Sequence, residues 1–220
     1  MIAAALLALQ DALSPDFRKV LWKALGLTIL LFIGILIGLE VAISILVAFP
    51  WPWLETILAV ATGLGVFAAF FFLMAPVTAV FAGLFLDDIA VLVEQRDYPG
   101  DAPGKPLATA TAIWTGVQFG LLVLIVNLLL LPTLLIGIGA VMMVIGNAYL
   151  LGREYFSMVA MRHMQPREAQ ALRKTNAARV FAAGLIPAGL ALIPVVNLFV
   201  PLFSTSYFVH IFKKIQAEPV

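Results

Sequence analysis

Between Ala24 and Phe49 the chain runs for 26 residues with one charged side chain, Glu40. At a rise of about 1.5 Å per residue, such a helix can cross the roughly 30 Å hydrocarbon core of a bilayer even when it is tilted. Of all 220 residues, 63% are hydrophobic and 11% charged, whereas soluble domains have about 45–50% apolar and about 25% charged residues. We therefore expect an all-α integral membrane protein that forms a single membrane domain.

Prolines and charges divide the rest of the chain. Pro50 and Pro52 end the first span, and the indoles of Trp51 and Trp53 suit the headgroup region. The predicted elements are an amphipathic interfacial helix at 2–13, a first transmembrane helix at 20–49, a second at 54–96 with a charged cytoplasmic extension, a hairpin at 107–151, a short cytoplasmic helix at 166–175 and a hairpin at 180–212.

The turns of both predicted hairpins, at Pro132 and Pro194, carry no charge. A turn that emerged into water would not be so apolar. The arm over residues 180–193 would be roughly 21 Å long as a helix, which falls short of a hydrocarbon core of about 30 Å. We expect re-entrant hairpins whose tips stay inside the membrane, while two ordinary spans with a tight turn fit the 107–151 hairpin equally well.

The basic residues gather on one side of this arrangement. All thirteen Lys and Arg residues lie at 18–23, 96–105, 153–179 and 213–214, and none flanks the three apolar turns. Under the positive-inside rule, both termini and the loops near residues 100 and 165 lie in the cytoplasm. We expect a multi-pass protein of the bacterial inner membrane.

The sequence contains no signature of an enzyme. It has no His-Glu-x-x-His motif, phosphate-binding glycine loop or nucleophile elbow, and it has no cysteine. His163 and His210 lie in different segments, and a lone histidine near a helix end is more often a polar interface residue than a ligand. We expect no metal site, no cofactor and no nucleic-acid partner.

The stretch from Ser14 to Lys19 is the strongest candidate for a binding site. Ser14 can cap a helix and Pro15 suits its first turn, so free N–H groups, the positive helix end and Arg18 favour an anion. The residues alone favour a simpler interpretation, in which the basic side chains anchor the helix at the interface, because Asp16 would repel an anion.

Two further groups of charges are candidates. Glu40 lies in an apolar span, where a carboxylate usually faces the protein interior, although its position ten residues before Pro50 also suits the interface. The extension of the second helix would form a charged vestibule that gathers ions, or a solvated face with salt bridges to the basic segment 153–179. The vestibule candidates are Asp87, Asp88, Glu94 and Arg96.

Glycines repeat at a spacing of four in two apolar segments, at Gly34 and Gly38 and at Gly116 and Gly120. Each pair places two glycines on one helix face, which lets another helix approach closely. The pattern indicates tight packing and is only weak support for an oligomer.

The order of these features resembles the CysZ family of bacterial sulfate permeases, relatives of the etoposide-induced membrane proteins, over about Leu9 to Phe212. The most specific similarity is the last hairpin, IPVVNLFVP at 193–201, and a second is Pro76 with the extension ending at 98–100. The resemblance implies sulfate uptake for cysteine synthesis, two full spans with two hemi-penetrating hairpins, and a homo-oligomer.

The family's sulfate-binding motif has a glycine, an apolar residue and two arginines after a proline, and it falls on Asp16, Phe17, Arg18 and Lys19. The resemblance thus implies that these residues contact the anion. Asp16 stands in place of the glycine, and Lys19 in place of an arginine, which removes one planar fork suited to oxyanions. We expect a permease or channel for sulfate or a similar oxyanion; the alternative is a membrane-shaping protein without transport activity.

Overall fold

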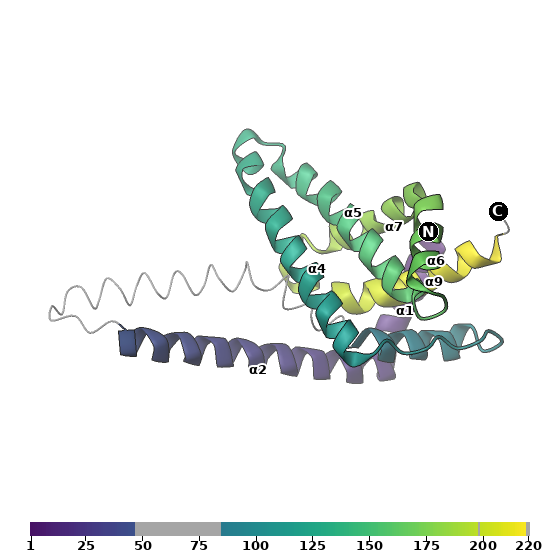
Figure 1. The fold of residues 1–220 in the computed structure, drawn as a ribbon, viewed down its shortest axis with the longest axis horizontal. Coiled ribbons are helices and arrows are strands. Elements are labelled where there is room, and N and C mark those ends of the chain that lie inside the picture. Colours follow the sequence, from purple (N-terminus) through teal and green to yellow (C-terminus); the bar gives the residue numbers. More distant parts are fainter. Residues whose placement is uncertain (47–84, 198, 219–220) are drawn as a thin grey trace.

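The computed structural model describes residues 1–46, 85–197 and 199–218, and every regular element in these ranges is a helix (Figure 1). The all-α prediction is therefore confirmed for this part of the chain. The turn at 50–53, the expected second span up to residue 84 and its kink at Pro76 lie outside the described residues.

The first two helices are α1 (Ile2–Ala12) and α2 (Pro15–Leu46). α1 packs against the last helix of the chain and buries Ala4, Ala8 and Asp11. α2 begins at Pro15 because proline suits a first turn and the Phe17 N–H donates to Ser14 Oγ at 3.4 Å. With its 32 residues, α2 is about 48 Å long and extends beyond the other described helices (Figure 1).

The first hairpin consists of α4 (Thr109–Leu130), the 3-10 helix η1 (Leu131–Ile136) and α5 (Gly139–Ala160). Gly137 joins η1 to α5 with a φ of 79°, a left-handed conformation that favours glycine. Among the described residues, one helical stretch, Trp114–Thr133, is long and apolar enough to cross a membrane. Each arm of 22 residues is about 33 Å long, so its length also allows a full crossing.

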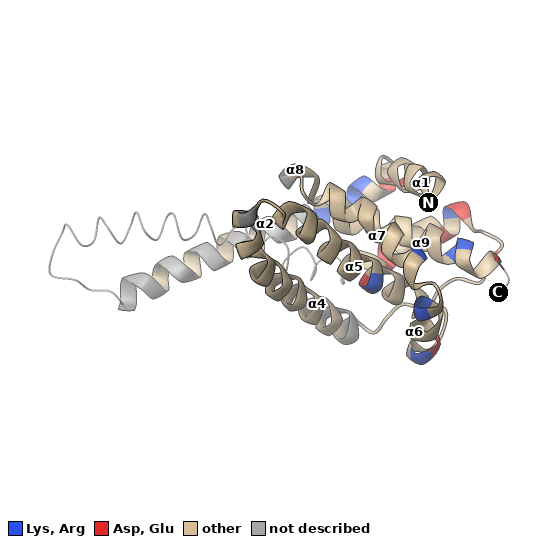
Figure 2. Ribbon diagram, turned by 90° about the horizontal axis from the view of Figure 1, so that it is seen from above, with Lys and Arg blue, Asp and Glu red and all other residues tan. Residues whose placement is uncertain are grey.

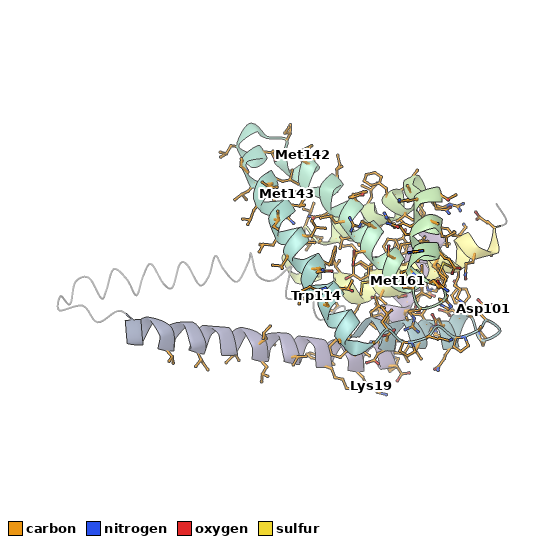
Figure 3. All side chains as sticks on the ribbon, in the orientation of Figure 1. Lys19, Asp101, Trp114, Met142, Met143 and Met161 are labelled. Carbon is orange, nitrogen blue, oxygen red and sulfur yellow. The ribbon has the colours of Figure 1, made fainter. Side chains whose placement is uncertain are left out.

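The tip of this hairpin is apolar and exposed in the single chain. Leu135 is 91% exposed and Ile138 is 52% exposed, and Figure 3 shows Met142 beside the tip. Further along the hairpin, the amides of Asn127 and Asn147 hydrogen-bond to each other at 3.1 and 3.3 Å and join the two arms. An apolar exterior with polar groups paired inside is typical of helices in lipid.

The second hairpin consists of α7 (Ala177–Leu190), the short α8 (Pro194–Asn197) and α9 (Val200–Ala217). α9 packs against α1, α5 and α7 and is buried from Val200 to Lys213. The core of the described chain therefore centres on this helix and on the C-terminal half of α5.

Two shorter helices lie at the charged end of the molecule (Figure 2). Residues 85–97 are helical and bury Leu86, Ile89 and Val93 in the core. α6 (Pro166–Thr175) covers the range expected for the short cytoplasmic helix. It starts with a capping box in which the Gln165 N–H donates to a Glu168 carboxylate oxygen at 3.0 Å.

Glycines bring α5 and α7 into close contact. A Cβ added at Gly152 would lie 2.6 Å from the carbonyl oxygen of Val180, and one added at Gly184 would overlap the carbonyl oxygen of Ala148. By contrast, a Cβ added at Gly34 or Gly38 would meet no atom within 4 Å. No described residue approaches Gly34 or Gly38, so the close packing expected at these glycines stays a prediction.

Candidate functional site

The predicted anion-binding residues lie in the first turns of α2. Phe17 is 3% exposed and packs in the core, whereas Asp16 and Arg18 are exposed. The Nζ atom of Lys19 lies 2.8 Å from Asp16 Oδ1 at the outer surface of α2 (Figure 3). The hydrogen bond and charge of Asp16 raise the pKa of Lys19. Within the described chain, Arg18 has no carboxylate oxygen within 4.0 Å.

This geometry gives the four residues different roles at the start of α2. Phe17 fixes the helix to the core, and Asp16 holds Lys19 on the surface. Arg18 is left as the cation that is free to contact a ligand. An anion near this turn would be attracted by the helix N-terminus and by Arg18 and repelled by Asp16.

A hollow of about 560 Å³ adjoins this turn. The end of α1, the start of α2 and the end of the 85–97 helix surround it, and its polar lining residues are Gln10, Ser14, Asp16, Gln95 and Arg96. The guanidinium of Arg96 lies 3.3 Å from Asp11 and 3.9 Å from Asp97. The cation that lines the hollow is therefore Arg96, which is held by two carboxylates.

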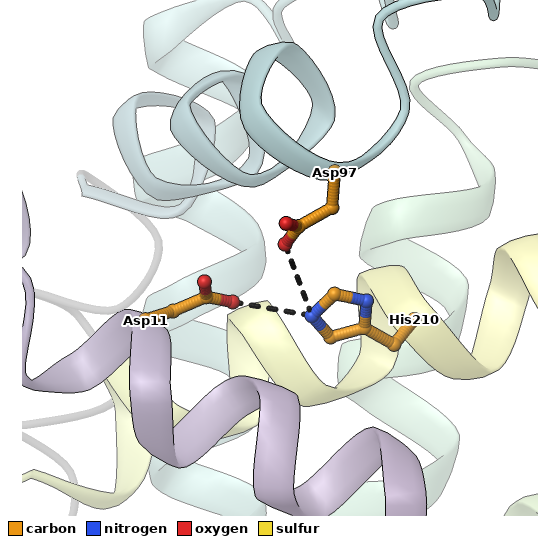
Figure 4. A group of neighbouring side chains, drawn as sticks. All are labelled: Asp11, Asp97 and His210. Atoms are coloured by element: carbon orange, nitrogen blue, oxygen red, sulfur yellow. Dashed lines mark hydrogen bonds and ion pairs between the residues drawn. The ribbon is translucent and has the colours of Figure 1, made fainter.

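A buried polar cluster joins α1, the end of the 85–97 helix and α9 (Figure 4). The Nε2 atom of His210 lies 3.1 Å from Asp11 Oδ2 and 3.7 Å from Asp97 Oδ2. Ser206 donates a hydrogen bond of 2.6 Å to Asp11 Oδ2, and the Tyr98 hydroxyl lies 2.8 Å from His210 Nδ1. These contacts connect the N-terminal helix to the last helix of the chain.

The protonation of this cluster follows from its contacts. Burial would raise the pKa of Asp11, but hydrogen bonds from His210 and Ser206 and the positive charges of His210 and Arg96 outweigh it and lower the pKa. Burial and nearby carboxylates raise the pKa of Tyr98 to about 12. The Tyr98 hydroxyl is therefore protonated at neutral pH, and it hydrogen-bonds to one ring nitrogen of His210 while the other contacts Asp11.

Part of this cluster has the geometry of a possible metal site, the one such group among the described residues. Asp11, Asp97 and His210 each place one ligand atom within 4.8 Å of the others. A metal ion would have to replace the contact between His210 Nε2 and Asp11, and the positive charge of Arg96 beside Asp11 opposes that binding. The contacts are better suited to holding helices together than to binding a metal.

A second buried cluster centres on Arg162, whose side chain is fully buried. Its guanidinium pairs with Asp87 and lies 3.3 Å from Glu94. Glu94 also accepts the N–H of Gly104 at 3.0 Å and lies 2.9 Å from His163 Nε2. Burial would raise the pKa of Glu94, but the Gly104 N–H, Arg162 and His163 outweigh it and lower the pKa. The loop near residue 100, which was predicted to lie in the cytoplasm, thus contributes a buried backbone group through Gly104.

The structure divides the predicted vestibule residues between these features. Asp87 and Glu94 pair with Arg162 of the basic segment, Arg96 lines the hollow, and Asp88 is exposed. The described contacts therefore match the salt-bridge alternative more closely than a single open vestibule. Glu40 lies on α2, but its side chain is outside the described residues.

The Asp11 cluster was not predicted from the sequence. The interpretation of His210 as an interface residue is wrong, because its side chain is 2% exposed and contacts Asp11 and Tyr98. One sequence signal pointed to this cluster: Asp11 is the single charged residue between residues 2 and 12. A lone carboxylate in an apolar helix indicates a partner elsewhere in the fold.

The family model described as Sulfate transporter CysZ/Etoposide-induced protein 2.4 matches residues 4–201. The chain belongs to this family. No curated protein matches it. The matched range runs from α1 into the start of α9 and includes the first turns of α2. The CysZ/etoposide-induced protein 2.4 family is a membrane-protein family of the transporter type and not an enzyme family.

Proposed function

We propose that this protein is a permease or channel that moves sulfate, or a similar small oxyanion, across the bacterial inner membrane into the cytoplasm for cysteine synthesis. The observation that carries the proposal is the family match over residues 4–201. The start of α2 supports it, because Arg18 is an exposed cation without a described carboxylate partner beside the positive end of a 32-residue helix.

In this proposal Arg18 is the principal contact of the anion, since its planar guanidinium can bind two oxygen atoms at once. Lys19 becomes a second contact when the anion displaces Asp16 from its Nζ atom, 2.8 Å away. Phe17 acts indirectly, because its buried side chain holds the first turn of α2 in place.

Uptake of radiolabelled sulfate into proteoliposomes tests these roles. We expect Arg18→Ala to lower the initial rate about tenfold, the size expected for losing one charge-assisted contact. Lys19→Ala should have a smaller effect, because Asp16 already holds this side chain. Asp16→Asn should raise the rate about two- to fivefold, because it frees Lys19 and removes an exposed repulsive charge.

Lys23→Ala is the matched control, since Lys23 is an exposed cation one turn further along α2 and should leave uptake unchanged. A parent protein with no uptake above empty liposomes would overturn the permease proposal and favour the membrane-shaping alternative. If the parent takes up sulfate and the Arg18→Ala variant does so at the same rate, only the proposed site is overturned.

We further propose that both termini lie in the cytoplasm, that the second hairpin turns back within the membrane and that the first does so as well. The 14-residue α7 is about 21 Å long and falls short of a core of about 30 Å. The chain has no cysteine, so Thr133→Cys and Val195→Cys each introduce a single reactive site at a hairpin turn. In right-side-out vesicles, we expect a membrane-impermeant maleimide to label neither position.

Asp101→Cys is the control for this labelling, because Asp101 is exposed in the loop assigned to the cytoplasm. We expect it to react only after the vesicles are permeabilised. Rapid labelling at 133 or 195 in intact vesicles would show that the corresponding tip reaches the outer side, and that hairpin would then be a full crossing.

A further inference from the structure

A cleft of about 320 Å³ lies between the C-terminal half of α5 and α6. Three arginines line it, Arg153 from α5 and Arg167 and Arg173 from α6, and we call them the cleft arginines. Glu154 is the carboxylate among the lining residues, so three cations face one anion. Figure 2 shows basic residues at this end of α5 and along α6.

Among the described residues, the cleft arginines lack the close ion pairs that the neighbouring arginines have. Arg162 and Arg179, in the same basic segment, each have a carboxylate oxygen within 3.3 Å. In the described ranges of the chain, no carboxylate oxygen lies within 4.0 Å of any cleft arginine. Glu154 attracts Arg153 and Arg173 electrostatically, so the three guanidinium groups of the cleft share one carboxylate and leave an excess of positive charge.

The Nε atom of Arg173 is the most specific indication of a ligand. It is shielded from solvent and has no described hydrogen-bond partner. A buried donor on a charged group is costly to leave unpaired, which indicates that an acceptor belongs beside it. The Gln170 amide also lines the cleft and offers a neutral donor.

We propose that this cleft binds a tetrahedral oxyanion group, sulfate or phosphate in character, through the cleft arginines. Guanidinium forks match the oxygen atoms of such groups and hold them bidentately. The group has two possible sources, a free inorganic anion in the cytoplasm or the phosphate of an anionic phospholipid, because basic pockets between helices at the cytoplasmic surface hold lipid headgroups. The cleft is separate from the start of α2, so this inference goes beyond the proposed transport function.

The test uses the purified full-length chain in neutral detergent micelles. Equilibrium dialysis with radiolabelled sulfate and phosphate measures the free anions, and native mass spectrometry with added phosphatidylglycerol counts retained lipids. We expect the parent to bind at least one of these probes and the double variant Arg167→Gln with Arg173→Gln to bind it at least tenfold more weakly. Lys174→Gln removes an exposed cation from the same helix that does not line the cleft, and it should bind like the parent.

The outcomes separate the sources and the alternatives. Binding of sulfate or phosphate assigns a free anion to the cleft, whereas retention of phosphatidylglycerol alone assigns a lipid headgroup. The proposal is overturned if the parent binds none of the three probes, or if Lys174→Gln weakens binding as much as the double variant, which would indicate diffuse charge attraction.

A variant at an exposed position guards against misfolding. Arg167 is exposed, so Arg167→Gln alone should preserve the fold, and we expect it to weaken binding about fivefold. Unchanged binding by the folded Arg167→Gln variant would also overturn the proposal. Repeating the measurement with Arg18→Ala separates this site from the proposed transport site, because binding in the cleft should persist when Arg18 is absent.

Discussion

Gly184→Ala is expected to lower the free energy of unfolding of this protein by about 2 kcal/mol or more. The added methyl group would overlap the carbonyl oxygen of Ala148 on α5, and that oxygen is part of a helix backbone that cannot rotate away. Overpacking a well-packed core costs about 1–3 kcal/mol. At an unhindered helix position, replacing glycine by alanine raises the free energy of unfolding by about 1 kcal/mol. A decrease would therefore indicate that the added methyl group overlaps the backbone of α5.

Gly189→Ala is the matched control, because Gly189 lies on the same helix and an added Cβ there would meet no atom within 4 Å. We expect it to leave stability unchanged or to raise it by up to about 1 kcal/mol. Denaturant unfolding in detergent, followed by helical circular dichroism, measures both variants. Equal stability of the two variants would contradict the close approach of α5 and α7.

The helical class and the two proline-turned hairpins could be predicted because both depend on local patterns. Apolar length, charge placement and the prolines at 132 and 194 are all visible within short windows of the sequence. The positions of close packing could not be predicted this way. They depend on how each helix is rotated about its own axis, which decides that Gly152 and Gly184 meet the backbone of a neighbouring helix.

The candidate sites also differ in whether a short stretch of sequence is enough to predict them. The residues at the start of α2 could be selected from a short motif, whereas the partners Asp11 and His210 lie 199 positions apart in the chain. The burial of both side chains depends on α1 packing against α9. A single sequence shows that Asp11 needs a partner, but it does not show which one.

The buried clusters have a consequence for the proposed transport site. The Asp11 cluster holds the end of α1 against α9, and Asp11 lies four residues before α2 begins at Pro15. Arg96 bonds Asp11 and also lines the hollow beside Ser14. The orientation of the first turn of α2, and with it of Arg18, is therefore set by contacts with distant segments as well as by its own cap.

Arg162→Met is expected to lower the free energy of unfolding by about 3–5 kcal/mol, the range seen when one partner of a buried ion pair is removed. Methionine fills part of the volume but leaves Asp87 and Glu94 without their cation. Lys174→Met is the control, because Lys174 is exposed and has no described ion pair. Its effect should stay within about 0.5 kcal/mol.

The pH dependence of stability distinguishes a lost charge pair from a lost packing contact in the Arg162→Met variant. In the parent, the pKa of Glu94 is lowered, so its contribution is present above the ordinary value of 4.5 and is lost as the pH falls through the lowered value. The variant loses the two Arg162 contributions that lower the pKa of Glu94, so this pKa is higher than in the parent, and protonation relieves the unpaired charge of the variant as the pH falls toward 4.5. Unfolding measured between neutral and mildly acidic pH should therefore show a deficit relative to the parent that shrinks with acidification. A deficit that stays constant with pH would show that Arg162 contributes through packing alone.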